Sequence, residues 1–231
     1  MVLVLTETSP PHPNQRHWLL LSAVLCAAAF SFWFLRRDAA NYLALIPENY
    51  TPYYWPRRYG LLLHIGGGTV ALLTGLTQVY LGLSGKTKAL HRRIGQLYVC
   101  AVAAGALGAC YLAASFPPPR DVLYSSGLVG LGITWVITTS MAYAFVRRGN
   151  VLQHRAWMLR SYVVTFGFVT LRVVEACLMS LGVSEDTSVG IAAWLCWTVP
   201  LLIAEPLIRS PRWLTVPAAT GGIAAQPTES S

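Results

Sequence analysis

Six long stretches of apolar residues follow one another along the chain, separated by short polar connections. They cover approximately residues 17–35, 58–83, 93–115, 122–146, 156–182 and 187–208. Each is close to the ~20 residues that a helix needs to cross a hydrocarbon core about 30 Å thick. Exposed backbone amides have no partner in hydrocarbon, and the period-two alternation of a membrane barrel is missing from these stretches. The pattern therefore predicts an all-α fold, a polytopic transmembrane bundle of about six helices.

Composition and charge agree with this prediction. Of the 231 residues, 55% are hydrophobic and 11% are charged, whereas a soluble domain carries roughly 25% charged residues. The formal net charge is +8, but the lysines and arginines stand at the ends of the apolar stretches and not along one polar face. This placement argues against nucleic-acid binding and makes the lipid bilayer the expected partner. It says nothing about the oligomeric state.

The basic residues also predict the orientation of the bundle. They concentrate in two connections, at Lys86, Lys88, Arg92 and Arg93 and at Arg147, Arg148, Arg155 and Arg160. By the positive-inside rule these connections are cytoplasmic, which places both termini inside and predicts a multi-pass protein of the cytoplasmic membrane. The first outer connection opposes the rule, because it is flanked by Arg36, Arg37, Arg57 and Arg58.

Three regions follow from these patterns. Residues 1–16 form a polar, Pro-containing N-terminus without the pattern of a removable signal peptide, and residues 17–208 form the bundle. Residues 209–231 are rich in Ala, Gly, Pro, Thr and Ser, which predicts a disordered tail. The connection after the first helix carries Tyr50, Tyr53, Tyr54 and Trp55. Such amphipathic rings suit the headgroup layer, so we expect this connection to lie along the membrane surface.

Two histidines begin helices at the same inner depth. His91 is followed by Arg92 and Arg93, and His154 by Arg155. Neutral imidazoles on neighbouring helices can bind a haem iron from both sides, so the pair is a candidate metal site for haem b. Arginine forks suit carboxylates, and these three arginines are candidates to hold the haem propionates. The plainer alternative is that His-Arg at a helix entrance meets lipid phosphate.

Glu205, near the inner end of the last helix, offers a third ligand beside His91 and His154 for a non-haem metal. The sequence contains no HxxHH or HExxH cluster, so this alternative rests on scattered single residues.

Polar residues also occur within the second helix, where ionisable groups are costly. His64, Gly68, Ala71, Gly75 and Gln78 recur every three or four residues and share one face. The small residues are explained by close helix packing, whereas His64 and Gln78 need a further reason.

The fifth helix has a polar stripe as well, in which Arg172 and Glu175 are three residues apart and can pair. Together with His64 and Gln78 they form the predicted polar intramembrane cluster. Its role is either structural or that of a proton, quinone or ligand site.

Several spaced motifs resemble a known family. They are His64-x-x-x-Gly68, Gln78, His91-Arg92-x-x-Gly95-x-x-Tyr98, His154-Arg155-x-Trp157-Met158-x-Arg160-Ser161-Tyr162 and Leu171-Arg172. Over residues 58–208 the chain is similar to a bacterial family of membrane proteins, the domain of unknown function twenty-three-oh-six. The resemblance implies the fold and the membrane location, and no activity.

A more distant resemblance is to cytochrome b561 and ferric reductase bundles, which hold two haems between histidines of neighbouring helices. This chain departs from that pattern, because the stretch 122–146 contains no histidine. At most one haem, between His91 and His154, is therefore supported, with Met179 as a weak substitute ligand at the outer end.

Three functions remain open at this stage, and the sequence does not decide whether the protein is an enzyme. The first is a haem-b redox protein, with the outer cluster as an electron or proton acceptor site and a quinone or redox protein as partner. The second is a transporter or ligand-binding bundle, in which His64, Gln78, Arg172 and Glu175 line a polar cavity. The pair of broken helices typical of transporters is not evident. The third is a structural or assembly subunit without chemistry.

Overall fold

The structure, a computed structural model, describes residues 13–50, 52, 54–84, 87–115 and 122–210, and over these it contains helices and no strand. The long helices are α1 (Pro13–Phe34), α3 (Arg58–Ser84), α4 (Lys88–Ser115), α5 (Val122–Arg147), α6 (Val151–Ser180) and α7 (Glu185–Arg209). The short ones are the π-helix η1 (Leu35–Ala39), α2 (Ala40–Leu43) and the 3-10 turns η2 (Pro47–Asn49) and η3 (Trp55–Arg57). The prediction of an all-α bundle is confirmed.

Five of the described helices are long and apolar enough to cross a membrane. They are Trp55–Gly82, Lys88–Ser115, Val122–Arg147, Val151–Ser180 and Glu185–Arg209. Their outer faces carry large apolar side chains, such as Leu107 at 66%, Leu202 at 73% and Ile203 at 67% exposure. Surfaces of this kind are unfavourable in water and are stable against acyl chains. That α1, the remaining long helix, also spans the membrane stays a prediction.

Several helices begin earlier than the apolar stretches that predicted them. The apolar stretches start at residues 93 and 156, whereas α4 begins at Lys88 and α6 at Val151. Long basic side chains allow this, because their stems lie along apolar surface while the charge reaches the headgroups. The Asn150 side chain caps α6 by accepting from the Gln153 amide, and Gly149, with φ +75°, separates α6 from α5. Residues 13–16 belong to α1, while most of the predicted termini, 1–12 and 211–231, lie outside the described residues.

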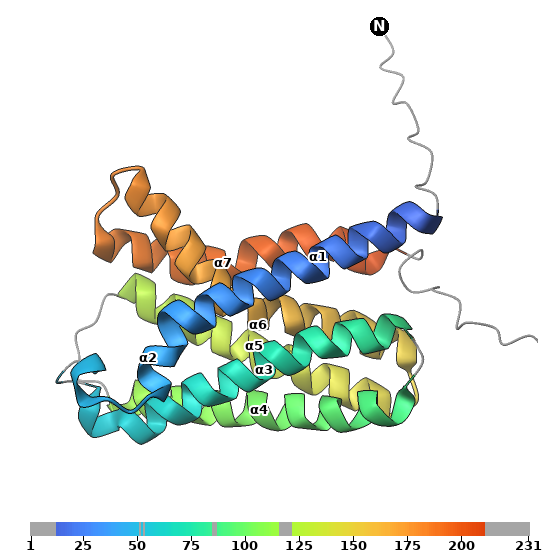
Figure 1. The fold of residues 1–231 in the computed structure, drawn as a ribbon, viewed down its shortest axis with the longest axis horizontal. Helices are drawn as coiled ribbons and strands as arrows, with labels where there is room; N and C mark the ends of the chain where they lie inside the picture. The colour runs from blue at the N-terminus through green and yellow to red at the C-terminus, as the bar shows by residue number, and fades with distance from the viewer. Residues whose placement is uncertain (1–12, 51, 53, 85–86, 116–121, 211–231) are drawn as a thin grey trace, which may run out of the picture.

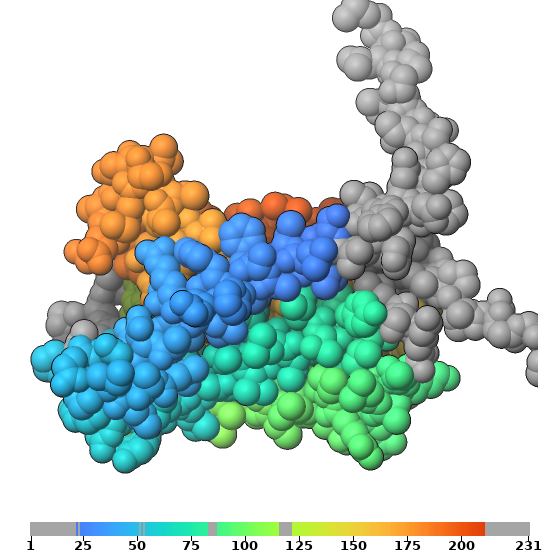
Figure 2. Space-filling view, viewed as in Figure 1, coloured from blue at the N-terminus to red at the C-terminus, as the bar shows by residue number. Residues whose placement is uncertain are grey.

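The long helices pack side by side in a bundle (Figure 1). Helix α3 packs antiparallel along α4, and α6 packs against both α5 and α7. Helix α1 lies obliquely across α3 and α6, as the space-filling view also shows for α3 (Figure 2). The starts of α4 and α6 and the end of α5 lie at one end of the bundle, so the two basic connections share that end.

Glycines bring α3 and α4 into close contact. A Cβ on Gly67 would lie 2.5 Å from the Gly105 nitrogen, and one on Gly108 would lie 2.5 Å from the His64 nitrogen. Small residues at these positions let the two backbones approach, as in many membrane helix pairs. The face of α3 that carries Gly68 and Gly75 is packed as well, but against aromatic side chains and not against a neighbouring backbone. Gly75 lies against the Tyr98 and Tyr162 rings, and Gly68 faces Phe168.

The connection between α2 and α3 folds into a small aromatic cluster. Tyr50 is 6% exposed, and its ring meets those of Tyr42 and Trp55 edge-on at 5.5 and 5.3 Å. Its hydroxyl donates to the Tyr42 carbonyl, and burial raises the pKa of Tyr50 above its usual value of 10.0. Tyr53, which was predicted to join these rings at the headgroup layer, lies outside the described residues.

Candidate functional site

The two inner histidines lie next to each other. His91 is in the first turns of α4 and His154 in those of α6, and their ring centres are 6.5 Å apart with the planes at 88°. Both histidines lie on helices and not on loops. The structure therefore brings together the two imidazoles that the sequence placed at one depth.

Hydrogen bonds fix the proton position on one of these rings. His154 Nδ1 lies 2.9 Å from the Ala142 carbonyl oxygen, which can only accept, so Nδ1 carries the hydrogen. In the neutral imidazole Nε2 then keeps its lone pair, which is the arrangement that metal-ligating histidines commonly have. His91 Nδ1 is buried without a hydrogen-bond partner in the described part of the chain. This end of the bundle therefore has one nitrogen that can bind a metal, His154 Nε2, and one buried nitrogen without a hydrogen-bond partner among the described residues, His91 Nδ1.

Small residues and arginines surround the pair. A Cβ on Gly82 would lie 3.6 Å from His91 Cε1, and Gln78 Nε2 donates to the His91 carbonyl over 2.6 Å. Gln78 is therefore part of this inner layer. Arg92 and Arg93 are exposed beside His91, and Arg155 is half-buried beside His154. That these arginines hold propionates stays a prediction, and the structure places them beside the histidines at one end of the bundle.

Glu205 does not join the histidines. Its carboxylate accepts two hydrogen bonds from Arg160, at 2.9 and 2.7 Å, and one from Arg209 at 2.6 Å. Two guanidinium groups thus occupy the oxygens that a metal would need. No group of three or more His, Cys, Asp or Glu side chains in the described ranges could hold a metal ion. The hypothesis of a non-haem site made by Glu205, His91 and His154 is wrong.

A hydroxyl network that the sequence did not predict fills the centre of the bundle. Its members, all buried, come from α4, α5 and α6 and are Tyr98, Trp135, Thr139, Ser161 and Thr165. Tyr98 Oη lies 2.7 Å from Ser161 Oγ and 2.8 Å from Thr165 Oγ1. Tyr98 and Ser161 follow His91 and His154 by seven residues each, a spacing that keeps them on the same faces. The seven-residue spacing from the histidines is the sequence pattern by which Tyr98 and Ser161 could have been identified as site residues.

The outer polar residues form an ion cluster that includes an unpredicted member. Arg172 donates to Glu175 over 2.8 Å, which confirms the predicted pair, and its Nε lies 3.5 Å from Asp38 Oδ1 in η1. Asp38 Oδ2 is buried without a hydrogen-bond partner among the described residues.

The other two predicted members lie elsewhere. His64 Nδ1 donates to the Gly105 carbonyl over 2.9 Å, and its ring meets Phe168 edge-on, one turn before Arg172. Gln78 lies fourteen residues further along α3, or about 21 Å away. The four residues predicted as one cluster are therefore divided between the two ends of the bundle. They do not line a common cavity.

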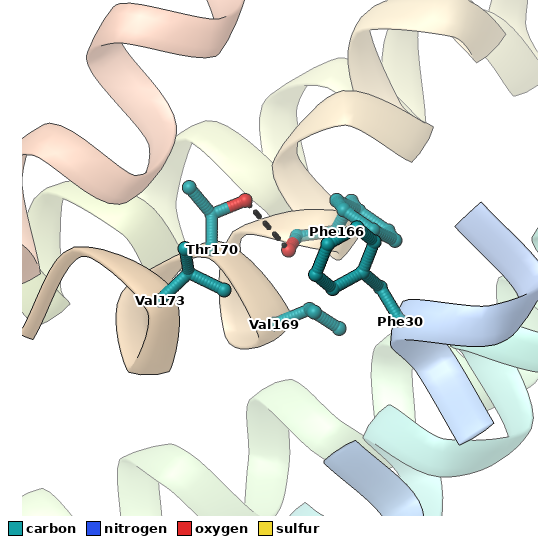
Figure 3. A pocket seen from close by; sticks show the side chains of 5 residues that line it. All are labelled: Phe30, Phe166, Val169, Thr170 and Val173. Carbon is teal, nitrogen blue, oxygen red and sulfur yellow. Dashed lines mark hydrogen bonds between the residues drawn. The ribbon is translucent and has the colours of Figure 1, made fainter. Parts of the chain in front are cut away.

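An apolar groove runs between α1 and α6 beside the ion cluster. It has a volume of about 210 Å³ and is lined by Phe30, Phe166, Val169, Thr170 and Val173 (Figure 3). The Thr170 hydroxyl donates to the Phe166 carbonyl within the helix, as the dashed line in Figure 3 marks, so the lining offers no free donor. Such a groove suits a hydrocarbon chain.

The comparison with known families agrees with these features. A family model described as a predicted membrane protein, DUF2306, matches residues 61–208. This range includes the two inner histidines, His64, the hydroxyl network and Arg172. No curated protein and no solved structure matches the chain.

Proposed function

The chain belongs to the predicted membrane protein family DUF2306, and we propose that it is a redox protein of the cytoplasmic membrane that binds one b-type haem between His91 and His154. The family description specifies the membrane and no reaction, so the proposal rests on the histidine pair. Its basic end, with Arg92, Arg93 and Arg155, would face the cytoplasm.

The separation of the two rings is the observation that carries this proposal. Imidazoles bound to opposite faces of one iron have ring centres roughly 6 to 6.5 Å apart, because each metal–nitrogen bond is about 2 Å and each nitrogen lies about 1 Å from its ring centre. His91 and His154 have 6.5 Å between their ring centres. The hydrogen bond to the Ala142 carbonyl orients the His154 ring as a metal ligand. Binding to a metal would also explain why His91 Nδ1 has no hydrogen-bond partner among the described residues. A bound haem would supply one-electron transfer.

The redox partner, a quinone or another redox protein, would approach at this inner end. Along α6, His154 and Arg172 are separated by about 27 Å at the rise of a helix. Direct electron transfer from the histidine pair to the outer ion cluster would be slow over such a distance. The transporter alternative loses its support, because the residues proposed to line one cavity are divided between the two ends.

The test is a reduced-minus-oxidised absorption spectrum of the full-length protein purified in detergent from haem-replete cells. We expect a Soret and an α band with one haem per chain, lost in His91→Ala and in His154→Ala. His64→Ala is the matched control, since it removes another intramembrane histidine whose Nδ1 bonds a carbonyl, and it should keep the haem. A colourless, monodisperse protein would refute the proposal. Metal analysis of that sample would separate a bare metal site from an assembly subunit without a cofactor.

A further inference from the structure

A rare backbone feature precedes the outer ion cluster. The helix that begins with α1 passes through the π-helix η1, Leu35–Ala39, before α2. Single π turns inside α-helices are uncommon and occur frequently at functional sites. Here the π turn directs Asp38 toward α6, where its Oδ1 lies 3.5 Å from Arg172 Nε. Asp38 thus reaches the cluster because of this turn.

Two carboxylates of the cluster share one guanidinium. Arg172 carries one positive charge, and Asp38 and Glu175 are its ion partners. Glu175 has the short contact of 2.8 Å, and Asp38 has the long one, with its second oxygen unpartnered. An unsatisfied carboxylate oxygen is costly at the membrane, and a donor from a bound ion or ligand removes that cost. The Asp38 side chain keeps 22% exposure, so a rotation of the carboxylate makes this oxygen reachable from outside.

The apolar groove lies between α1 and α6, the helices that also lead to Asp38 and carry Arg172. Val169, Thr170 and Val173 surround Arg172 in the sequence of α6, and Phe30 closes the groove from α1 (Figure 3). From Phe166 to Val173 the groove extends about 10 Å along the helix. Asp38 follows Phe30 by eight residues, or about 12 Å along the helix, so a chain that lies in the groove parallel to the helices would have its polar end toward Asp38.

We propose that this junction of α1 and α6 binds a phospholipid with a primary amine head group, such as phosphatidylethanolamine. Its acyl chain lies in the groove, and its ammonium donates to the Asp38 oxygen that has no hydrogen-bond partner among the described residues. Its phosphate meets Arg36 and Arg37, which are exposed in η1; the Arg37 guanidinium stacks at 5.3 Å from the Trp33 ring centre. An oxidised quinone has no donor for the carboxylate, and a quinol brings no charge.

Native mass spectrometry of the full-length protein with lipids of matched chains tests this site. Phosphatidylethanolamine and phosphatidylcholine carry the same charges, but choline has no N–H donor. We expect the ethanolamine lipid to bind about fivefold more tightly, which corresponds to one ordinary hydrogen bond. Asp38→Leu removes both acceptor oxygens and should abolish this preference. Glu185→Gln removes an exposed carboxylate in the first turn of α7 and should preserve it.

A second variant separates the groove from the head-group site. Val173→Trp fills the groove and should weaken binding of every two-chain lipid, while the preference for ethanolamine among the residual binding remains. Helicity and the elution profile show that each variant is folded. Equal binding of ethanolamine and choline lipids would overturn the proposal, as would preference for phosphatidylglycerol or displacement by an equal concentration of a prenyl quinol. Because haem content is not part of the readout, failure here leaves the histidine pair untouched.

Discussion

Tyr98 Oη lies 2.7 Å from Ser161 Oγ and so links α4 to α6 in the middle of the bundle. The network around this pair is closed. Trp135 Nε1 donates to Thr165 Oγ1 over 2.7 Å, and the Thr165 and Thr139 hydroxyls donate to carbonyls one turn earlier in their own helices. Every donor has an acceptor, so the network has no vacancy for a substrate and serves to fix how the helices are rotated.

Thr165→Val should destabilise the protein more than Tyr98→Phe. Without the Thr165 hydroxyl the buried Trp135 N–H loses its acceptor, which costs about 1–3 kcal/mol. Without the Tyr98 hydroxyl, Ser161 still bonds Thr139 over 2.7 Å and no donor is orphaned, so a loss of at most about 1 kcal/mol is expected. Unfolding in mixed micelles measures both. Thr77→Val, on an exposed hydroxyl that bonds its own helix, should be neutral, and equal losses in the first two variants would contradict the assignment.

Two adjacent glycines of α3 should respond in opposite ways to alanine. A Cβ on Gly67 would lie 2.5 Å from the Gly105 nitrogen and 2.8 Å from the Ala101 oxygen, so α3 and α4 must separate. We expect Gly67→Ala to lower the free energy of unfolding by about 1–3 kcal/mol. A Cβ on Gly66 meets nothing within 4 Å, and Gly66→Ala should stabilise the helix by up to about 1 kcal/mol. Identical unfolding curves would show that the helices are not this close.

The ion pairs of Glu205 should be unequal. Arg160 is 16% exposed in its side chain and makes the bidentate contact, whereas Arg209 is 76% exposed. Removing the carboxylate by Glu205→Gln leaves a shielded guanidinium without its counter-ion, and a loss of about 1–3 kcal/mol is expected, below the range for fully buried pairs. Arg209→Ala should change stability by less than about 0.5 kcal/mol. A double-mutant cycle of Arg160 with Glu205 measures the coupling, and coupling near zero would refute the inequality.

The sequence predicts the parts of this structure that depend on one helix at a time. The length of the apolar stretches is sufficient to predict the helices, and the three-residue spacing of Arg172 and Glu175 predicts their pair. Asp38 was not predicted in the cluster, because its position depends on the π turn and on how α1 crosses α6. Glu205 was assigned to the histidines because depth alone does not tell which side chain of a neighbouring helix is nearest. Rotation and order of helices depend on packing between them, which one chain's pattern does not encode.

The orientation of the bundle gives a further prediction. The first ten residues of α4 and of α6 together carry five basic residues, whereas the start of α7 carries Glu185 and Asp186. A C-terminal green fluorescent protein should therefore fluoresce inside the cell, and alkaline phosphatase fused after Gly182 should be active outside it. The reverse pattern would place the histidine pair at the outer side.

Two of the four arginines that oppose this orientation, Arg57 and Arg58, have partners within the protein. Arg57 donates to the Ser115 carbonyl through Nε and Nη2, at 3.2 and 3.0 Å, and Arg58 stacks at 4.8 Å from the Trp55 ring centre. Because these contacts hold both side chains at their own end of the bundle, their charges are explained by packing and not by topology. Arg57→Gln with Arg58→Gln should therefore leave both reporters unchanged while lowering stability. An inverted reporter pattern in that double variant would show instead that these two charges contribute to the choice of orientation.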